Sequence, residues 1–175
     1  MKSLQFDQFV PSDVCLKCDG CCRFKEPGTI WRPKLSDEET AAVKASGLAE
    51  KILSADTLDT NQFIRTKPGC GEHLCQFFNP SDHSCAIYTA RPFECELYPF
   101  LISRTEKGTG LYIHLNCPHV QSNHHNSFMS QYITHLKKFL KRPDVHDFLV
   151  RNRHLLNDYS AYQDELEFVF LLEGV

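Results

Sequence analysis

The stretch Cys15-Leu-Lys-Cys18-Asp-Gly-Cys21-Cys22 places four thiols within eight residues. Buried structural cysteines behave as isolated small hydrophobic residues, so a core does not account for four of them in one polar turn. A gap of two residues lets a turn direct both sulfurs toward one ion, and repeating the gap gives a third sulfur the same approach. We expect Gly20 to supply the backbone angles for this turn, and Cys21 and Cys22 to point apart toward two sites. The stretch therefore predicts metal binding.

Five more cysteines follow this group, namely Cys70, Cys75, Cys85, Cys95 and Cys117. Dense cysteines at short spacing in a reducing compartment indicate metal ligands rather than a disulfide framework. Two four-sulfur sites would use eight of the nine cysteines. The predicted ligands are Cys15, Cys18, Cys21, Cys22, Cys75, Cys85, Cys95 and Cys117. Cys70 stands between two glycines and is the thiol that we leave outside the sites.

The neighbours of two later cysteines favour ligation. Pro92 is suited to the first position of a short helix, which would place Cys95 near a positive helix end and lower the pKa of its thiol. Cys117-Pro118 is similar to the Cys-Pro that closes ferredoxin-type cysteine runs. His119, His124 and His125 follow closely and could complete a mixed site, although solvated loop histidines are the alternative interpretation.

The charge balance limits the possible partners. The 175 residues contain 19 Lys and Arg against 22 Asp and Glu, a formal net charge of -3. This balance argues against a nucleic-acid or membrane-surface partner, whereas an unidentified protein partner is compatible with it. No apolar run approaches the roughly 18 residues of a membrane-spanning helix, and residues 1–14 lack the apolar region of a secretory signal. We therefore expect a cytoplasmic protein.

The patterning predicts an α+β fold with a small antiparallel sheet, surrounding helices and a metal-organised, loop-rich cysteine region. We expect one domain over 1–175, with the metal-binding region at 11–120 and a helical part at 121–175 that ends in a strand. Ser36 and Glu39 form a capping box that begins a helix ending near Gly47. The other expected elements are a helical turn at 48–53, strands at 63–66, 99–104, 111–115 and 165–172, and helices at 124–142 and 144–156.

Two segments together resemble a known family. The first is Cys15-x-x-Cys18-x-x-Cys21-Cys22, and the second is Cys85-Ala-Ile-Tyr88-x-x-Arg91-Pro92-x-x-Cys95-x-x-Tyr98-Pro99. They resemble the CxxCxxCC cysteine-cluster family, described as a putative zinc- or iron-chelating domain, over about residues 11–120, and Cys75-Gln-Phe-Phe resembles its Cys-x-Phe-Leu segment. Glu96 stands where the family usually has Arg. The resemblance implies metal chelation without a defined reaction.

The spacing bears on which metal is bound. Zinc takes four thiolates in a closed tetrahedral site, commonly from two separated Cys-x-x-Cys pairs. A Cys-x-x-Cys-x-x-Cys run with a remote cysteine is typical of iron–sulfur clusters, and this chain has no second Cys-x-x-Cys. An iron–sulfur cluster is therefore the preferred cofactor, with zinc as the alternative. We expect Arg91 and Tyr88 beside the cofactor, where Arg91 would pair with Asp19 or donate to a cluster sulfur.

Three functions follow from these observations. The first is an iron–sulfur protein that transfers electrons or supports a partner enzyme. The second is a zinc-stabilised interaction module. The third is a cluster-dependent redox or methyl-transfer enzyme, which is open by analogy because flagellin lysine methylases carry a similar cysteine cluster. The sequence identifies no catalytic residue.

Overall fold

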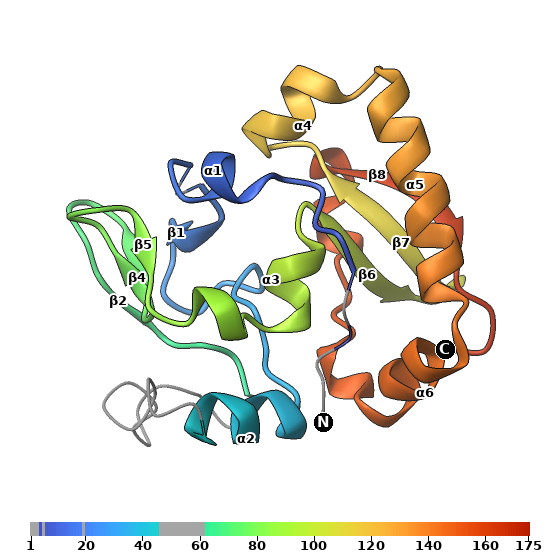
Figure 1. The fold of residues 1–175 in the computed structure, drawn as a ribbon, viewed down its shortest axis with the longest axis horizontal. Helices are drawn as coiled ribbons and strands as arrows, with labels where there is room; N and C mark the ends of the chain where they lie inside the picture. The colour runs from blue at the N-terminus through green and yellow to red at the C-terminus, as the bar shows by residue number, and fades with distance from the viewer. Residues whose placement is uncertain (1–3, 5, 19, 46–61) are drawn as a thin grey trace. The chain divides into compact units, whose positions relative to one another are not determined.

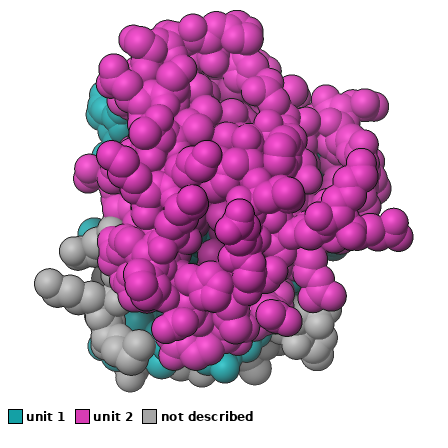
Figure 2. Space-filling model, turned by 90° about the vertical axis from the view of Figure 1, so that its right-hand side faces the viewer, with its two compact units in different colours: residues 1–3, 11–96 teal, residues 4–10, 97–175 magenta. Residues whose placement is uncertain are grey.

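The structure is a computed structural model that describes residues 4, 6–18, 20–45 and 62–175. The chain divides into two compact units, coloured separately in Figure 2. The first contains Pro11–Glu96, and the second contains Leu4–Val10 and Leu97–Val175. The described strands form three small antiparallel sheets beside short helices, which confirms the α+β class. The single domain remains a prediction.

The first unit is built from short elements (Figure 1). Its helical segments are α1 (Ser12–Cys15), the 3-10 turn η1 (Gly20–Cys22), α2 (Asp37–Ala45), the 3-10 turn η2 (Tyr88–Ala90) and α3 (Phe93–Leu97), whose last residue belongs to the second unit. Its strands are β1 (Arg23–Phe24), β2 (Thr66–Pro68), β3 (His73–Cys75), β4 (Phe78–Asn79) and β5 (Ser84–Cys85). Strands of two or three residues cannot stabilise a sheet alone, so packing must fix them.

The predicted capping box begins α2. The Ser36 N–H donates to Glu39 Oε2 at 2.8 Å, and the Glu39 N–H donates to Ser36 Oγ at 3.1 Å. Glu39 also accepts the Phe93 N–H at Oε1, 2.5 Å away, so one carboxylate satisfies backbone donors of two helices. The predicted helix end at Gly47 and the turn at 48–53 lie outside the described residues.

The predicted strand at 63–66 is wrong in its bounds. Phe63 makes only an isolated bridge to Lys34, and the strand runs from Thr66 to Pro68. Proline is tolerated because Pro68 ends a strand at the edge of the β1-β3-β2 sheet. The turn after β2 then requires a small residue, since a Cβ at Gly69 would lie 2.9 Å from the Leu74 side chain.

The second unit places helices beside a three-stranded sheet. Its strands β6 (Phe100–Thr105), β7 (Gly108–His114) and β8 (Leu166–Leu171) lie in the order β6-β7-β8 (Figure 1). Its helices are α4 (Pro118–Asn123), α5 (Ser127–Leu140) and α6 (Pro143–Arg151), with 3-10 turns η3 (Arg153–Leu155) and η4 (Ser160–Glu165). Leu111 and Ile113 alternate along β7 and are both almost fully buried.

The predicted hairpin is confirmed, but its turn is shorter than expected. Strand β7 begins at Gly108 rather than at Leu111, and Thr105 pairs with Gly108. The turn therefore consists of Glu106 and Lys107, and Gly108 takes a left-handed φ of 115°. The final strand was predicted at 165–172 and forms as β8, paired with β7.

The helix predicted at 124–142 begins later than expected. Asn126 is the N-cap of α5, because its side chain accepts the Met129 N–H at 2.9 Å. The sequence prediction missed α4, which begins at Pro118, because it assigned no element between 115 and 124. The helix predicted at 144–156 is α6, which ends at Arg151 and is followed by η3.

The segment before the cysteines belongs to the core of the second unit. Phe9 is 0% exposed, and its ring contacts those of Phe100 at 5.6 Å and Tyr132 at 5.0 Å. The Tyr132 hydroxyl donates to the Asp7 carbonyl at 2.6 Å. These contacts join the start of the described chain to β6 and α5 within the second unit.

Within the part of the chain that the structure describes, no helix is both long enough and apolar enough to cross a bilayer.

The double role of Glu39 gives a stability prediction. Glu39→Ala removes acceptors from two backbone donors, so we expect a loss of about 2 kcal/mol in the unfolding free energy, given roughly 1 kcal/mol per bond. Asp37→Ala is the control, because it removes an acid from the same helical turn, one whose side chain accepts a hydrogen bond from Gln62 Nε2 at 2.7 Å. Urea unfolding of the metal-loaded protein measures both. Equal effects would show that the Phe93 contact contributes nothing.

Candidate metal centre

The N-terminal thiols follow one another around tight backbone turns. The Cys15 N–H donates to the Pro11 carbonyl at 2.8 Å, and the Cys18 N–H donates to the Val14 carbonyl at 2.9 Å. The 3-10 turn η1 then carries Cys21 and Cys22. Gly20 does not have a left-handed φ, and a Cβ there would lie 3.8 Å from Cys18 Sγ, an ordinary contact. The expectation that Gly20 supplies unusual angles is therefore wrong.

Strand pairing brings Cys75 toward these thiols. Strand β1 follows Cys22 directly, and it pairs with β3 so that Arg23 faces Leu74, the residue before Cys75. An ion pair between Arg23 and Glu72 joins the same two segments. The register therefore holds Cys22 and Cys75 at adjacent ends of a strand pair.

A second strand pair positions Cys85. In the β4–β5 hairpin Cys85 faces Phe78, and the Ala86 N–H donates to the Phe77 carbonyl at 2.9 Å. Two aspartate-type turns close the loop, since Asn79 and Asp82 each accept a backbone N–H two residues further along the chain. Polar turn residues thus set where the thiol lies.

Helix α3 carries the last thiol of the first unit. Its first N–H is bonded to Glu39, and Glu94 Oε2 accepts the Lys34 N–H at 2.7 Å. Burial raises the pKa of Glu94 to about 8. Sequence reasoning missed this role of both carboxylates, because the contacts join residues more than fifty positions apart. They fix the orientation of the short helix that presents Cys95.

Seven thiols of the first unit interact electrostatically, and we call them the thiol network. Its members are Cys15, Cys18, Cys21, Cys22, Cys75, Cys85 and Cys95. Cys21 is the common partner, because its charge raises the pKa of five other members, namely Cys15, Cys22, Cys75, Cys85 and Cys95. Four members lie within residues 15–22, and the other three lie far along the sequence on β3, β5 and α3.

Ionisation of these thiols is opposed by two effects. A hydrogen bond with Cys21, followed by burial, raises the pKa of Cys22 far above its ordinary value. Burial is the first cause for two others, raising the pKa of Cys75 to about 12 and that of Cys95 well above its usual range. This is opposite to the lowered pKa expected for Cys95 at a helix start, because burial and neighbouring thiols outweigh a helix of five residues.

Arg91 is the cation that favours thiolates here. Its Nη1 lies 3.8 Å from Cys15 Sγ, and its Nε donates to the Tyr88 carbonyl at 3.0 Å. The guanidinium lies 3.8 Å from the centre of the Tyr88 ring. Burial raises the pKa values of Cys15 and Cys85, and Arg91 opposes that increase for both thiols. The proposed partner Asp19 lies outside the described residues.

Two cysteines are not counted in the thiol network. Cys70 is exposed in the turn between β2 and β3. Cys117 is buried at the N-cap of α4, in the second unit. The histidines considered as ligands also belong to the second unit, where His124 Nδ1 lies 3.2 Å from His125 Nε2 and its Nε2 lies 3.0 Å from Glu167. Ligation by Cys117 and these histidines remains a prediction.

The aromatic residues near the network form its apolar support. Phe24, Phe77 and Phe78 are buried in one core with Cys75, and Cys22 and Cys85 pack against this core. The apolar surroundings exclude water from one side of the thiols, which strengthens electrostatic interactions there.

The chemistry of this donor set fits a soft cation. Thiolate sulfurs are the preferred ligands of zinc and of iron–sulfur clusters, and a bound cation would reverse the repulsion that keeps the thiols protonated. Among the described residues, no three Cys, His, Asp or Glu side chains already have the arrangement of a closed site. Closure around an ion therefore requires the thiols to rotate toward one another and lose their protons.

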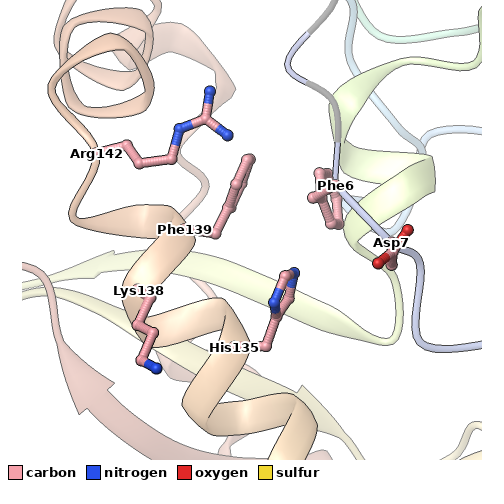
Figure 3. Close-up of a pocket in the computed structure, with 6 residues that line it drawn as sticks. All are labelled: Phe6, Asp7, His135, Lys138, Phe139 and Arg142. Carbon is pink, nitrogen blue, oxygen red and sulfur yellow. The ribbon is translucent and has the colours of Figure 1, made fainter.

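The second unit has an open pocket of different chemistry (Figure 3). It is lined by Phe6, Asp7, His135, Lys138, Phe139 and Arg142. Arg142 lies against Asp144 through two side-chain bonds, and its guanidinium lies 5.3 Å from the Phe139 ring. No thiol lines this pocket, so it has no part in the cysteine chemistry.

Comparison with known proteins agrees with this assignment. No curated protein and no solved structure matches the chain. The model of one family, CxxCxxCC, described as "Putative zinc- or iron-chelating domain", matches residues 14–127. The matched range includes every member of the thiol network and also Cys117. With its cysteines brought together in the first unit and most of its length matched, this chain belongs to the CxxCxxCC family.

Proposed function

We propose that the protein binds an iron–sulfur cluster through the thiol network and uses it to transfer electrons or to support a partner enzyme. The interaction of seven thiols, four from residues 15–22 and three from β3, β5 and α3, carries this proposal. One structural zinc site takes four thiolates, so seven thiols exceed what it needs. The Cys15-x-x-Cys18-x-x-Cys21 run with remote cysteines is the arrangement of cluster ligands.

The network can serve a cluster in two ways. The apolar groups around the buried thiols would limit the access of water to a bound cluster, and they would tune its potential. Arg91 and Tyr88 would stand beside it, Arg91 by stabilising the negative charge of the Cys15 sulfur. When bound, a cluster of this kind accepts and donates single electrons. A cytoplasmic location is part of the same proposal, because reduced thiols persist there.

Metal analysis tests the choice of cofactor. Protein purified without oxygen should be brown, should bleach with a reductant, and should contain iron and acid-labile sulfide. Elemental analysis and absorbance spectra measure this. A colourless protein with stoichiometric zinc would exclude the iron–sulfur cluster and establish the zinc-stabilised module. A protein that retains neither metal would contradict chelation.

Two exposed cysteines form a matched pair for testing ligation. Cys21 and Cys70 are both exposed thiols of the first unit, but only Cys21 interacts with five other thiols. We expect Cys21→Ser to lose most of the bound metal and Cys70→Ser to keep it. Metal content per chain is the measurement, and circular dichroism checks that both variants fold. Equal metal content in the two variants would remove Cys21 from the ligand set.

The contact of Arg91 with Cys15 gives a pH-dependent prediction. Arg91 lowers the pKa of Cys15 and Cys85, so its removal lets protons compete better for these sulfurs. Arg91→Ala should release metal to a chelator about 10-fold more readily. On acidification, release should also begin at a higher pH than in the parent protein.

The control for this variant is Arg32→Ala in the same unit, which loses a cation–π contact with Phe63 and a hydrogen bond to the Thr29 carbonyl. Chelator competition followed over a pH series measures both variants. If Arg91→Ala and Arg32→Ala retain metal alike, Arg91 only holds the turn after Tyr88.

A further inference from the structure

Strand β8 has an open edge that carries exposed apolar side chains. It pairs with β7 on one side, and no other strand in the described part of the chain pairs with its second edge. Phe168 and Leu171 are 52% and 55% exposed and are the two most exposed large hydrophobic residues of the described chain. An unprotected apolar edge of this kind invites the addition of another strand.

The opposite edge of the same sheet is different. There Ser103 of β6 forms a parallel bridge with Asn157, and the Arg104 N–H donates to the Asn157 carbonyl at 2.9 Å. The β6 edge is therefore partly covered by the chain itself, and β8 is the edge available for pairing.

A bulge changes how the side chains of β8 alternate. Leu111 faces Phe170 and Tyr112 faces Phe168, so Val169 is an extra residue without its own partner on β7. Phe168 packs on the Tyr112 ring at 5.5 Å and lies close to Gly110, which defines the outer face. The extra residue therefore moves Phe170 to the opposite face.

The helix-covered face receives two residues of β8. Lys137 of α5 lies 5.5 Å from the centre of the Phe170 ring, and Glu167 lies 3.0 Å from His124. The outer face receives Leu166, which faces His114, and Leu171, which faces Gly110. Along β8, Leu166 therefore lies on the outer face and Glu167 on the inner face. After the bulge at Phe168 and Val169, Phe170 lies on the inner face and Leu171 on the outer face.

This order is the same when it is read from either end. A regular strand of six residues would have its first and last side chains on opposite faces. Because of the bulge, a second copy of β8 running antiparallel can place Leu166 opposite Leu171 on the outer face and Glu167 opposite Phe170 on the inner face. Each cross-strand pair then joins side chains of the same face.

The charges agree with this register. Glu167 of one copy would lie beside the Phe170 ring of the other, over which Lys137 holds its ammonium group. The two-fold symmetry makes two such carboxylate–ammonium pairs. We propose that two copies of this chain associate through β8, antiparallel and centred between Phe168 and Val169, to join their three-stranded sheets into one.

Charge reversal tests both the dimer and its register. Sedimentation equilibrium of the full chain, metal-loaded and with reductant to exclude disulfides, should show a monomer–dimer equilibrium. Glu167→Lys and Lys137→Glu should each weaken the dimer by about 10-fold, because each places like charges together at two positions. The double variant should restore most of the affinity, since the pairs are exchanged rather than lost.

Control variants separate this surface from others. Phe168→Ser should abolish the dimer, whereas Phe128→Ser should not, although Phe128 is also exposed, at 46%. His124→Ala removes the local partner of Glu167 and should leave the dimer intact. A parent protein that is monomeric at every concentration would overturn the proposal and identify the bulge as protection of the edge. A dimer insensitive to Phe168→Ser and to both charge reversals would also overturn it.

Discussion

The thiols of the first unit are held together in surroundings where both burial and mutual repulsion oppose their ionisation. Arg91 opposes this effect by lowering the pKa of Cys15 and Cys85. The network is therefore least stable electrostatically when charged and without a cation. A bound metal would convert this repulsion into attraction, so that the energy of binding becomes energy of folding.

The short elements of the first unit also depend on polar and charged contacts for their positions. Its strands contain two or three residues each, and their positions are set by ion pairs and buried carboxylates as much as by apolar packing. Glu39 accepts hydrogen bonds from the Ser36 N–H before α2 and from the Phe93 N–H of α3. A displacement of α2 would therefore also displace α3, the helix that carries Cys95. The second unit contains no member of the thiol network, and its sheet and α5 are joined by aromatic contacts such as that of Phe100 with Tyr132. We infer that loss of metal would affect the two units unequally.

The sequence predicted the elements that depend on contacts between residues close together in the chain. The capping box at Ser36, the hairpin around Glu106 and the last strand could be read from the sequence, since each depends on residues close together along the chain. Contacts between distant residues could not be read in this way. The burial that raises the pKa of Cys95 and the bond from Glu39 to Phe93 arise only after folding. The cysteine spacing and the family resemblance identified the ligand candidates, but not that Cys21 is their common partner.

The second unit is assembled from both ends of the described chain, with Phe9 enclosed by aromatic rings from β6 and α5. During synthesis on the ribosome, the segment around Phe9 emerges before the first unit, whereas its partners Phe100 and Tyr132 emerge after that unit. The first unit is synthesised between them, so it can fold and bind metal before Phe9 packs against its partners. A fusion partner placed immediately before Leu4 would therefore be attached to a segment that packs late. One placed after Val175 would allow β8 to leave the ribosome, and to complete the sheet, before synthesis ends.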